Sequence, residues 1–214
     1  MRSRRDRART FTERARRAQI IECAIEVIAE AGYAQASVSR IAERSGVAKS
    51  VVLYHFAGKD ELVDAVVTRI FLTGAAAMLP SIDAEPTAGG RLRAYIHSNL
   101  AFIDRHRAYA LAMLDIWTSY RTPTGQRLDE AAAATEPEGD LARLDPEVIF
   151  QEGVASGEFR PLPARSMAIA LRQAIDGAVL QISRDPGFDL HAYGADVVVL
   201  FELGCRPEPA GDHP

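Results

Sequence analysis

The chain has 214 residues, of which 48% are hydrophobic and 25% are charged, and its formal net charge is −4. This composition is ordinary for a soluble globular protein and excludes wholesale disorder. The longest strongly apolar run, residues 197–201, is far shorter than the ~20 residues that span a bilayer. No apolar leader segment follows the N-terminal arginines, and two cysteines are too few for a disulfide scaffold. We therefore expect a cytoplasmic protein with no membrane partner.

Charge is distributed unevenly along the chain. Residues 1–60 carry a net charge of +5, whereas residues 61–214 carry −9. This asymmetry indicates that the N-terminal part binds a polyanion and that the acidic remainder of the chain does not. Residues 1–11 are predicted to form a disordered basic arm, which can still bind phosphates, and residues 207–214 a disordered tail.

Apolar residues recur at helical spacing throughout, and no stretch shows the sustained alternation that is typical of strands. A first helix is predicted over 12–31, short helices over 38–44 and 48–55, and a longer helix from Lys59 to Pro80. Further helices are predicted over 90–105, 107–120, 125–134, 141–156, 164–184 and 189–203. The predicted fold class is all-α, with about nine or ten helices.

Residues 37–62 carry the most informative pattern, SVSRIAERSGVAKSVVLYHFAGKDEL. Ser37 is a favourable N-cap for a short helix, and Ala42 is small where a second helix must cross closely. Gly46 supplies the positive φ of a three-residue turn between two helices. This is the spacing of a helix-turn-helix, although an ordinary helical hairpin would share it. The second helix would present outward Lys49, Ser50, Val51, Leu53, Tyr54 and His55.

Three motifs occur here in order: Ala-Gly-Tyr, then Ser-Val-x-x-Ile-Ala-x-x-x-Gly-Val-x-Lys-Ser, then Leu-Tyr-His-Phe-x-x-Lys-Asp-Glu-Leu. Together they resemble the DNA-binding domain of the tetracycline-repressor (TetR) family. The resemblance covers about residues 13–65. It implies a homodimeric bacterial transcription regulator, expected to be a repressor, that binds a palindromic operator in double-stranded DNA. It also implies two domains, a helix-turn-helix DNA-binding domain over 12–58 and a helical domain over 59–206 for dimerisation and for a small-molecule effector that releases the DNA.

The resemblance also implies which residues contact DNA: Ser37, Ser39, Arg40, Lys49, Ser50, Val51, Leu53, Tyr54, His55 and Lys59. The chain departs from the family pattern at Ala48, where serine often caps the recognition helix. The order Ser39-Arg40 leaves open which of these two residues reaches a base. A cation at a helix N-terminus opposes the helix dipole, and a phosphate shared by Lys59 and the free N–H groups would resolve this conflict. The alternative is a solvated charge beside Asp60 and Glu61.

The second half of the chain contains the expected effector site and the expected dimer interface. His97, Phe102, Met113, Trp117 and Tyr120 form an aromatic and methionine-rich set, which either is plain core or lines a pocket for an apolar or aromatic effector. Residues 164–182 and 190–203 carry wide apolar stripes rich in small residues. The stripes predict a two-fold four-helix interface, with an intrachain core as the alternative. The expected interface residues are Leu171, Ala174, Ala178, Ile182, Tyr193, Val197 and Phe201.

No segment of the sequence indicates catalysis, a cofactor or a metal. The histidines at 97, 106, 191 and 213 lack metal-ligand spacing, and the chain contains no nucleophile motif or glycine-rich phosphate loop. The remaining alternative to a regulator is a helical ligand-binding or enzymatic dimer whose helix-turn-helix no longer binds DNA. The basic N-terminus and the placement of the only two lysines, at 49 and 59, favour DNA binding.

Overall fold

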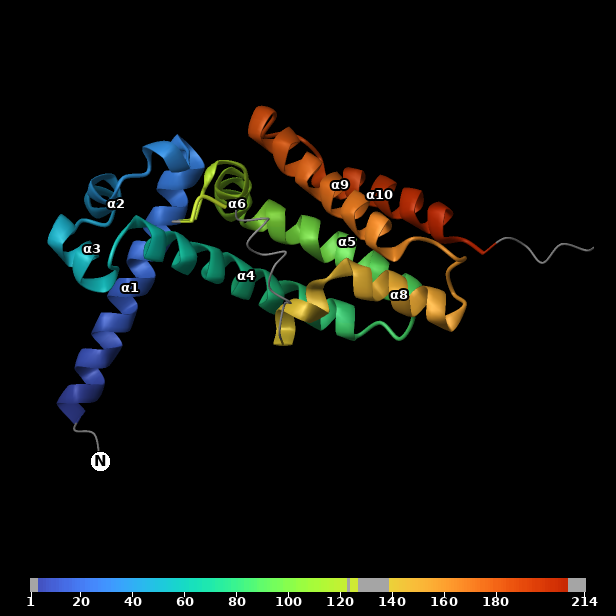
Figure 1. Ribbon diagram of the computed structural model, residues 1–214, viewed down its shortest axis with the longest axis horizontal. Coiled ribbons are helices and arrows are strands. Elements are labelled where there is room, and N and C mark those ends of the chain that lie inside the picture. The colour runs from blue at the N-terminus through green and yellow to red at the C-terminus, as the bar shows by residue number, and fades with distance from the viewer. Residues whose placement is uncertain (1–3, 123, 127–138, 208–214) are drawn as a thin grey trace, which may run out of the picture. The chain divides into compact units, whose positions relative to one another are not determined.

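The computed structural model describes residues 4–122, 124–126 and 139–207 (Figure 1). These residues form helices and no β-strand, which confirms the all-α prediction. The α-helices are α1 (Arg4–Ala31), α2 (Val38–Arg44), α3 (Lys49–His55), α4 (Lys59–Asp83), α5 (Ala88–Arg105), α6 (Arg107–Ser119), α8 (Pro146–Ser156), α9 (Ala164–Arg184) and α10 (Leu190–Cys205), and the 3₁₀ turns are η1 (Tyr33–Gln35) and η2 (Gly139–Leu144). The predicted helix over 125–134 and the predicted tail lie almost wholly outside the described residues.

The largest differences from the predicted helices occur at three places. The first helix begins at Arg4, so α1 includes residues 4–11, which the sequence predicts to form a basic arm. Residues 4–11 are compatible with a helix, because none of them is a glycine or proline that would stop it. α4 continues through Pro80 to Asp83. The predicted helix over 141–156 is divided into η2 and α8, because the Asp145 carboxylate caps α8 and Pro146 takes its first position.

The chain divides into two compact units. Unit 1 comprises residues 1–71 and 108–135, and unit 2 comprises 72–107 and 136–214. The predicted boundary between residues 58 and 59 therefore falls inside unit 1. The first part of α4 belongs there because its apolar side chains, Leu62, Val63, Val66 and Ile70, are buried in the same core as α1, α2 and α3.

The core of unit 1 is built on α1, whose isoleucines are buried, whereas Glu26 and Glu30 of the same helix are exposed. Ile20, Ile25 and Ile28 pack there with Ile41 of α2 and Val52 of α3. α6 completes the same core with its buried side chains Ala112 and Ile116, followed by Tyr120. α6 is therefore part of the unit that holds the helix-turn-helix.

Unit 2 is a separate helical layer formed by α5, α8, α9, α10 and the end of α4. α5 packs against α8, α9 and α10, and α9 packs against both α8 and α10 (Figure 1). Its core includes Phe150, whose ring centroid lies 6.2 Å from that of Phe159 and 6.1 Å from that of Phe201.

α4 is long and apolar enough to cross a membrane by length and composition, and it is the one such helix among the described residues. Its most apolar 18-residue window is 44% buried inside the protein. α4 supplies core residues to both units, and this packing within the chain accounts for its apolar composition.

Candidate functional site

The turn between α2 and α3 has the geometry that the sequence predicts. The Ser37 hydroxyl accepts a hydrogen bond from the Arg40 N–H at 3.2 Å and so caps α2. Gly46 has φ +65°, and the Val47 N–H donates to the Ala42 carbonyl at 3.0 Å. A side chain at this left-handed position would be strained, which explains the glycine. Ala48 gives α3 no side-chain cap, as expected.

α3 has one buried side and one exposed side. Val52 is 1% exposed and packs in the unit 1 core, whereas Tyr54 is 70% exposed. Lys49, Ser50 and Leu53 are also exposed, and Val51 and His55 are half-buried. Ser39 and Arg40 are exposed on the neighbouring α2. A seven-residue helix that exposes a large aromatic ring, a leucine and a lysine offers a surface suited to a nucleic-acid groove.

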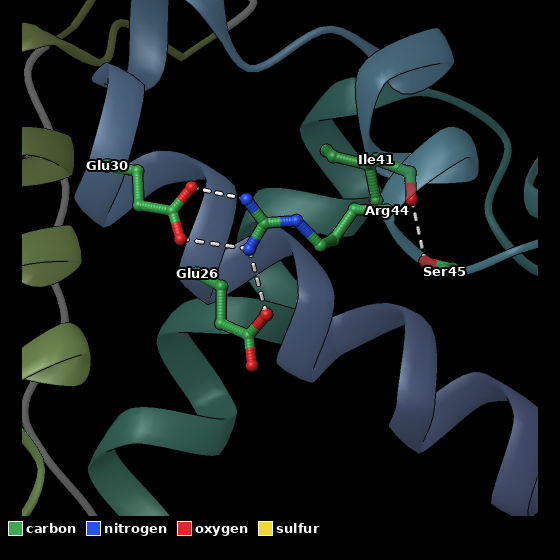
Figure 2. A network of polar contacts seen from close by, with 5 residues as sticks. All are labelled: Glu26, Glu30, Ile41, Arg44 and Ser45. Carbon is green, nitrogen blue, oxygen red and sulfur yellow. Dashed lines mark hydrogen bonds and ion pairs between the residues drawn. The ribbon is translucent and has the colours of Figure 1, made fainter.

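The position of α2 on α1 is fixed by an ion-pair network (Figure 2). The Arg44 guanidinium lies between Glu26 and Glu30 and donates to the Glu30 carboxylate at 2.9 Å and to the Glu26 carboxylate at 3.1 Å. The hydrogen bond from Arg44 lowers the pKa of Glu30. Because these bonds occupy the Arg44 guanidinium, its charge is directed toward α1 and not toward an external phosphate.

Lys59 has internal partners that the sequence did not indicate. Its ammonium donates to the Tyr33 carbonyl at 2.6 Å and lies 3.8 Å from the centroid of the Tyr33 ring. Burial lowers the pKa of Lys59. The Lys59 ammonium therefore has a structural role, because it holds η1 against α4. Binding a DNA phosphate, as predicted, would compete with these contacts to Tyr33.

The other side of η1 is held by α6. The Tyr33 N–H donates to the Asp115 carboxylate, and the Tyr33 ring makes an edge contact with Tyr120 at a centroid distance of 5.4 Å. Burial raises the pKa of Tyr120 to about 12, with Asp60 and Asp64 adding to the effect. η1 directly precedes the cap of α2, so these contacts set where the helix-turn-helix begins.

The five residues predicted to line an effector pocket are divided between the two units. His97 and Phe102 belong to unit 2, where His97 is exposed and Phe102 is buried. Met113, Trp117 and Tyr120 belong to unit 1, and Tyr120 is part of its core. The residue types at these positions indicated apolar helix faces. They did not show that the faces belong to two different units.

Unit 2 contains a different candidate for apolar ligands. An open groove of ≈ 320 Å³ follows the second half of α4, with Arg143 of η2 at one end. Its lining residues are Leu72, Ala75, Ala76, Leu79, Pro80, Asp83 and Arg143. Arg143 forms an ion pair with Asp83. None of the predicted pocket residues lines this groove.

The residues predicted for the dimer interface are mostly buried within the chain itself. Ala178 is fully buried. Leu171, Ile182, Val197 and Phe201 are also buried in the core of unit 2, and Ala174 and Tyr193 are half-buried. The opposite sides of α9 and α10 expose a second apolar set, which we call the outer face: Ile169, Leu180, Val199, Leu200 and Leu203. Both sides of these helices are apolar, so the stripes alone could not show which side the chain buries.

The capped α2, the left-handed glycine turn and the exposed side of α3 together define a helix-turn-helix DNA-binding protein. Residues 20–66 match the family model described as bacterial regulatory proteins, tetR family. The fatty acid metabolism regulator protein of Bacillus subtilis is 28% identical over 191 residues, which cover 88% of this chain and 94% of that protein. The DNA-binding domain of the chain is of the TetR type, and the chain is a transcriptional regulator similar to members of that family.

One further relative and two solved structures are also similar to the chain. The regulator BetI of Cronobacter sakazakii is 29% identical over 174 residues, which cover 78% of each chain. The crystal structure of FadR from Bacillus subtilis in complex with stearoyl-CoA has a TM-score of 0.74 at 26% identity and covers 88% of this chain and 99% of that chain. The ketosteroid regulator KstR2 of Mycobacterium tuberculosis, at 20% identity and a TM-score of 0.65, shares the fold.

Proposed function

We propose that the chain is a cytoplasmic homodimeric repressor that binds a palindromic operator and is released by an effector of the long-chain acyl-coenzyme A class. The observation that carries this effector class is the 28% identity to the Bacillus subtilis fatty acid regulator, which extends over 88% of the chain and so includes unit 2. The related FadR was solved in complex with stearoyl-CoA. The groove along α4 supports the class, because its wall is apolar and its end carries charged groups.

For operator binding, the proposed surface is the exposed side of α3 with the start of α2. Lys49 and Arg40 are placed to bind phosphates, and Ser39, Ser50 and Tyr54 to reach base edges. Ser37, Val51, Leu53 and His55 complete the predicted contact set. Two such surfaces in a dimer must lie about 34–36 Å apart to enter successive major grooves on one side of the DNA.

For dimerisation, the proposed surface is the outer face of α9 and α10. These two helices pack against each other, and their five large exposed apolar residues lie on the sides directed away from the core. Several large apolar side chains exposed on two neighbouring helices are typical of an interaction site. Two-fold pairing of the two helices would bury the surface in a four-helix arrangement.

The effector proposal is tested with stearoyl-CoA itself, using operator DNA selected from a random pool by the purified protein. We expect stearoyl-CoA to weaken operator binding about 5–150-fold, the usual range of allosteric coupling. Fluorescence anisotropy of labelled operator measures the effect, with coenzyme A and stearate as separate controls. Unchanged operator affinity at saturating stearoyl-CoA would refute this effector class, and the absence of any enriched palindrome would refute the proposed operator binding.

A pH dependence is expected from Asp176, which lies on the same side of α9 as Ile169 and Leu180. Burial raises the pKa of Asp176, and the nearby Arg172 offsets part of the effect. A raised pKa in the folded state means that the neutral form is favoured, so stability is lost as the pH rises through the folded-state pKa. We therefore expect Asp176→Asn to raise the thermal unfolding temperature and to tighten the dimer at pH 7. Both differences should shrink at acidic pH in parallel unfolding and sedimentation experiments, and a constant difference would contradict this account.

A further inference from the structure

Two histidines that are 94 positions apart in the sequence meet on the surface of unit 2. His97 lies on α5 and His191 lies in the first turn of α10. The centroids of their imidazole rings are 6.4 Å apart, and the ring planes are inclined by 27°. Both side chains are exposed. The sequence predicted no metal site, because the spacing of histidines along the chain does not show this contact between two helices.

Close packing of α5 on α10 produces the contact. Gly194 lies one turn after His191 and faces α5, where an added Cβ would meet Leu100 Cδ1 at 2.9 Å and His97 Nδ1 at 3.6 Å. A larger residue at 194 would therefore have to displace the end of the Leu100 side chain, so α5 and α10 approach closely at this point. One turn before His97 on α5, the Arg93 guanidinium bonds the Glu202 carboxylate of α10 at 3.0 Å, so a second contact joins the same two helices.

The two imidazoles are not engaged by other described groups. Neither ring donates or accepts a hydrogen bond among the residues that the structure describes. The nearby Asp189 carboxylate is used by the backbone N–H groups of His191 and Ala192, both at 2.9 Å, and caps α10. The ring nitrogens are therefore free to bind a ligand from solvent.

We propose that His97 and His191 form a binding site for a late transition-metal ion that joins α5 to α10. An ion bound by one nitrogen of each ring at about 2.0–2.1 Å places the ring centroids about 5–6.5 Å apart, depending on the angle at the metal. The observed 6.4 Å lies at the upper end of this range, and because the rings are stacked, both exposed side chains must rotate to turn one nitrogen each toward the same ion and reach a tetrahedral geometry.

The donor set defines the class of ion. Imidazole nitrogen suits Zn²⁺, Ni²⁺ and Cu²⁺ and is a poor ligand for Mg²⁺ and Ca²⁺. No third histidine, cysteine or carboxylate joins the pair within the described parts of the chain, so water completes the coordination. The site needs neither operator nor effector, and it is independent of the proposed function.

The test uses the untagged full-length chain at pH 7.5 with Zn²⁺, and with Mg²⁺ as the control ion. Zn²⁺ at 100 times its dissociation constant should lower the unfolded-to-folded ratio about 100-fold and raise the thermal unfolding temperature. His97→Gln and His191→Gln should each abolish this shift while leaving the metal-free unfolding temperature close to that of the wild type, because both side chains are exposed. His106→Gln, a histidine change at the C-cap of α5, should keep the full shift relative to its own metal-free value.

A spectroscopic measurement makes the assignment independent of stability. The electron paramagnetic resonance spectrum of one equivalent of bound Cu²⁺ should show coupling to two imidazole nitrogens in the wild type and to one in each single variant. The proposal is overturned if Zn²⁺ leaves the wild type unchanged, if both single variants keep the shift, or if His106→Gln loses it as well. A Cu²⁺ spectrum that is identical in the wild type and the variants would overturn it too.

Discussion

Replacing Leu200 with arginine is expected to convert the protein to a monomer that keeps its helical content and binds operator about 10²–10⁴-fold more weakly. Leu200 is 63% exposed on α10, so a charge there costs the folded monomer little. In a two-fold interface the substitution occurs twice, and both charges would have to be buried without partners. Sedimentation equilibrium, circular dichroism and operator titration report the three properties separately.

Two control variants sharpen this experiment. Val197→Arg places the same charge on the buried side of α10, where it should unfold unit 2 and reduce the helical signal. Gln151→Arg places it on the exposed surface of α8 and should change neither mass nor affinity. If Leu200→Arg remains dimeric while Val197→Arg unfolds, the interface lies outside the outer face of α9 and α10.

The local features of this fold could be predicted because they depend on neighbouring residues. Ser37 caps α2, Gly46 takes a positive φ, and the buried and exposed sides of α3 follow from a helical spacing of apolar residues. The same reasoning failed at Asp145, where a capping residue followed by proline divides a predicted helix. Local patterns thus locate helices well and can miss a break within an apolar run.

Features that depend on tertiary packing could not be predicted in this way. On α9 both sides of the helix are apolar, so the sequence does not distinguish the buried Ala178 from the exposed Leu180. The hydrogen bond between Asp115 and Tyr33 joins residues that are 82 positions apart. In the sequence, only the position of a single aspartate in an apolar helix pointed to it. α6 is adjacent in sequence to α5 and yet packs in the other unit, which separated the predicted pocket residues.

A second large effect is expected at Lys59, where alanine should lower the free energy of unfolding of unit 1 by about 1–3 kcal/mol. The substitution removes the charged hydrogen bond to the Tyr33 carbonyl and the ammonium that lies over the Tyr33 ring. It also releases η1 from α4, ahead of the cap of α2. Chemical denaturation followed by circular dichroism measures the loss, and Lys59→Met separates the charge from the packing of the aliphatic stem.

The matched comparison is the other lysine of the chain, Lys49, which is exposed at the start of α3. Lys49→Ala should leave stability unchanged, weaken all operator sequences about equally and reduce the slope of log affinity against log salt by about 1. Lys59→Ala should reduce affinity with little change in that slope, because its charge is already directed at a carbonyl and an aromatic ring within the protein. If Lys59→Ala instead reduces the salt slope by about 1 and leaves stability unchanged, Lys59 is a phosphate ligand and its contacts with Tyr33 open when DNA binds.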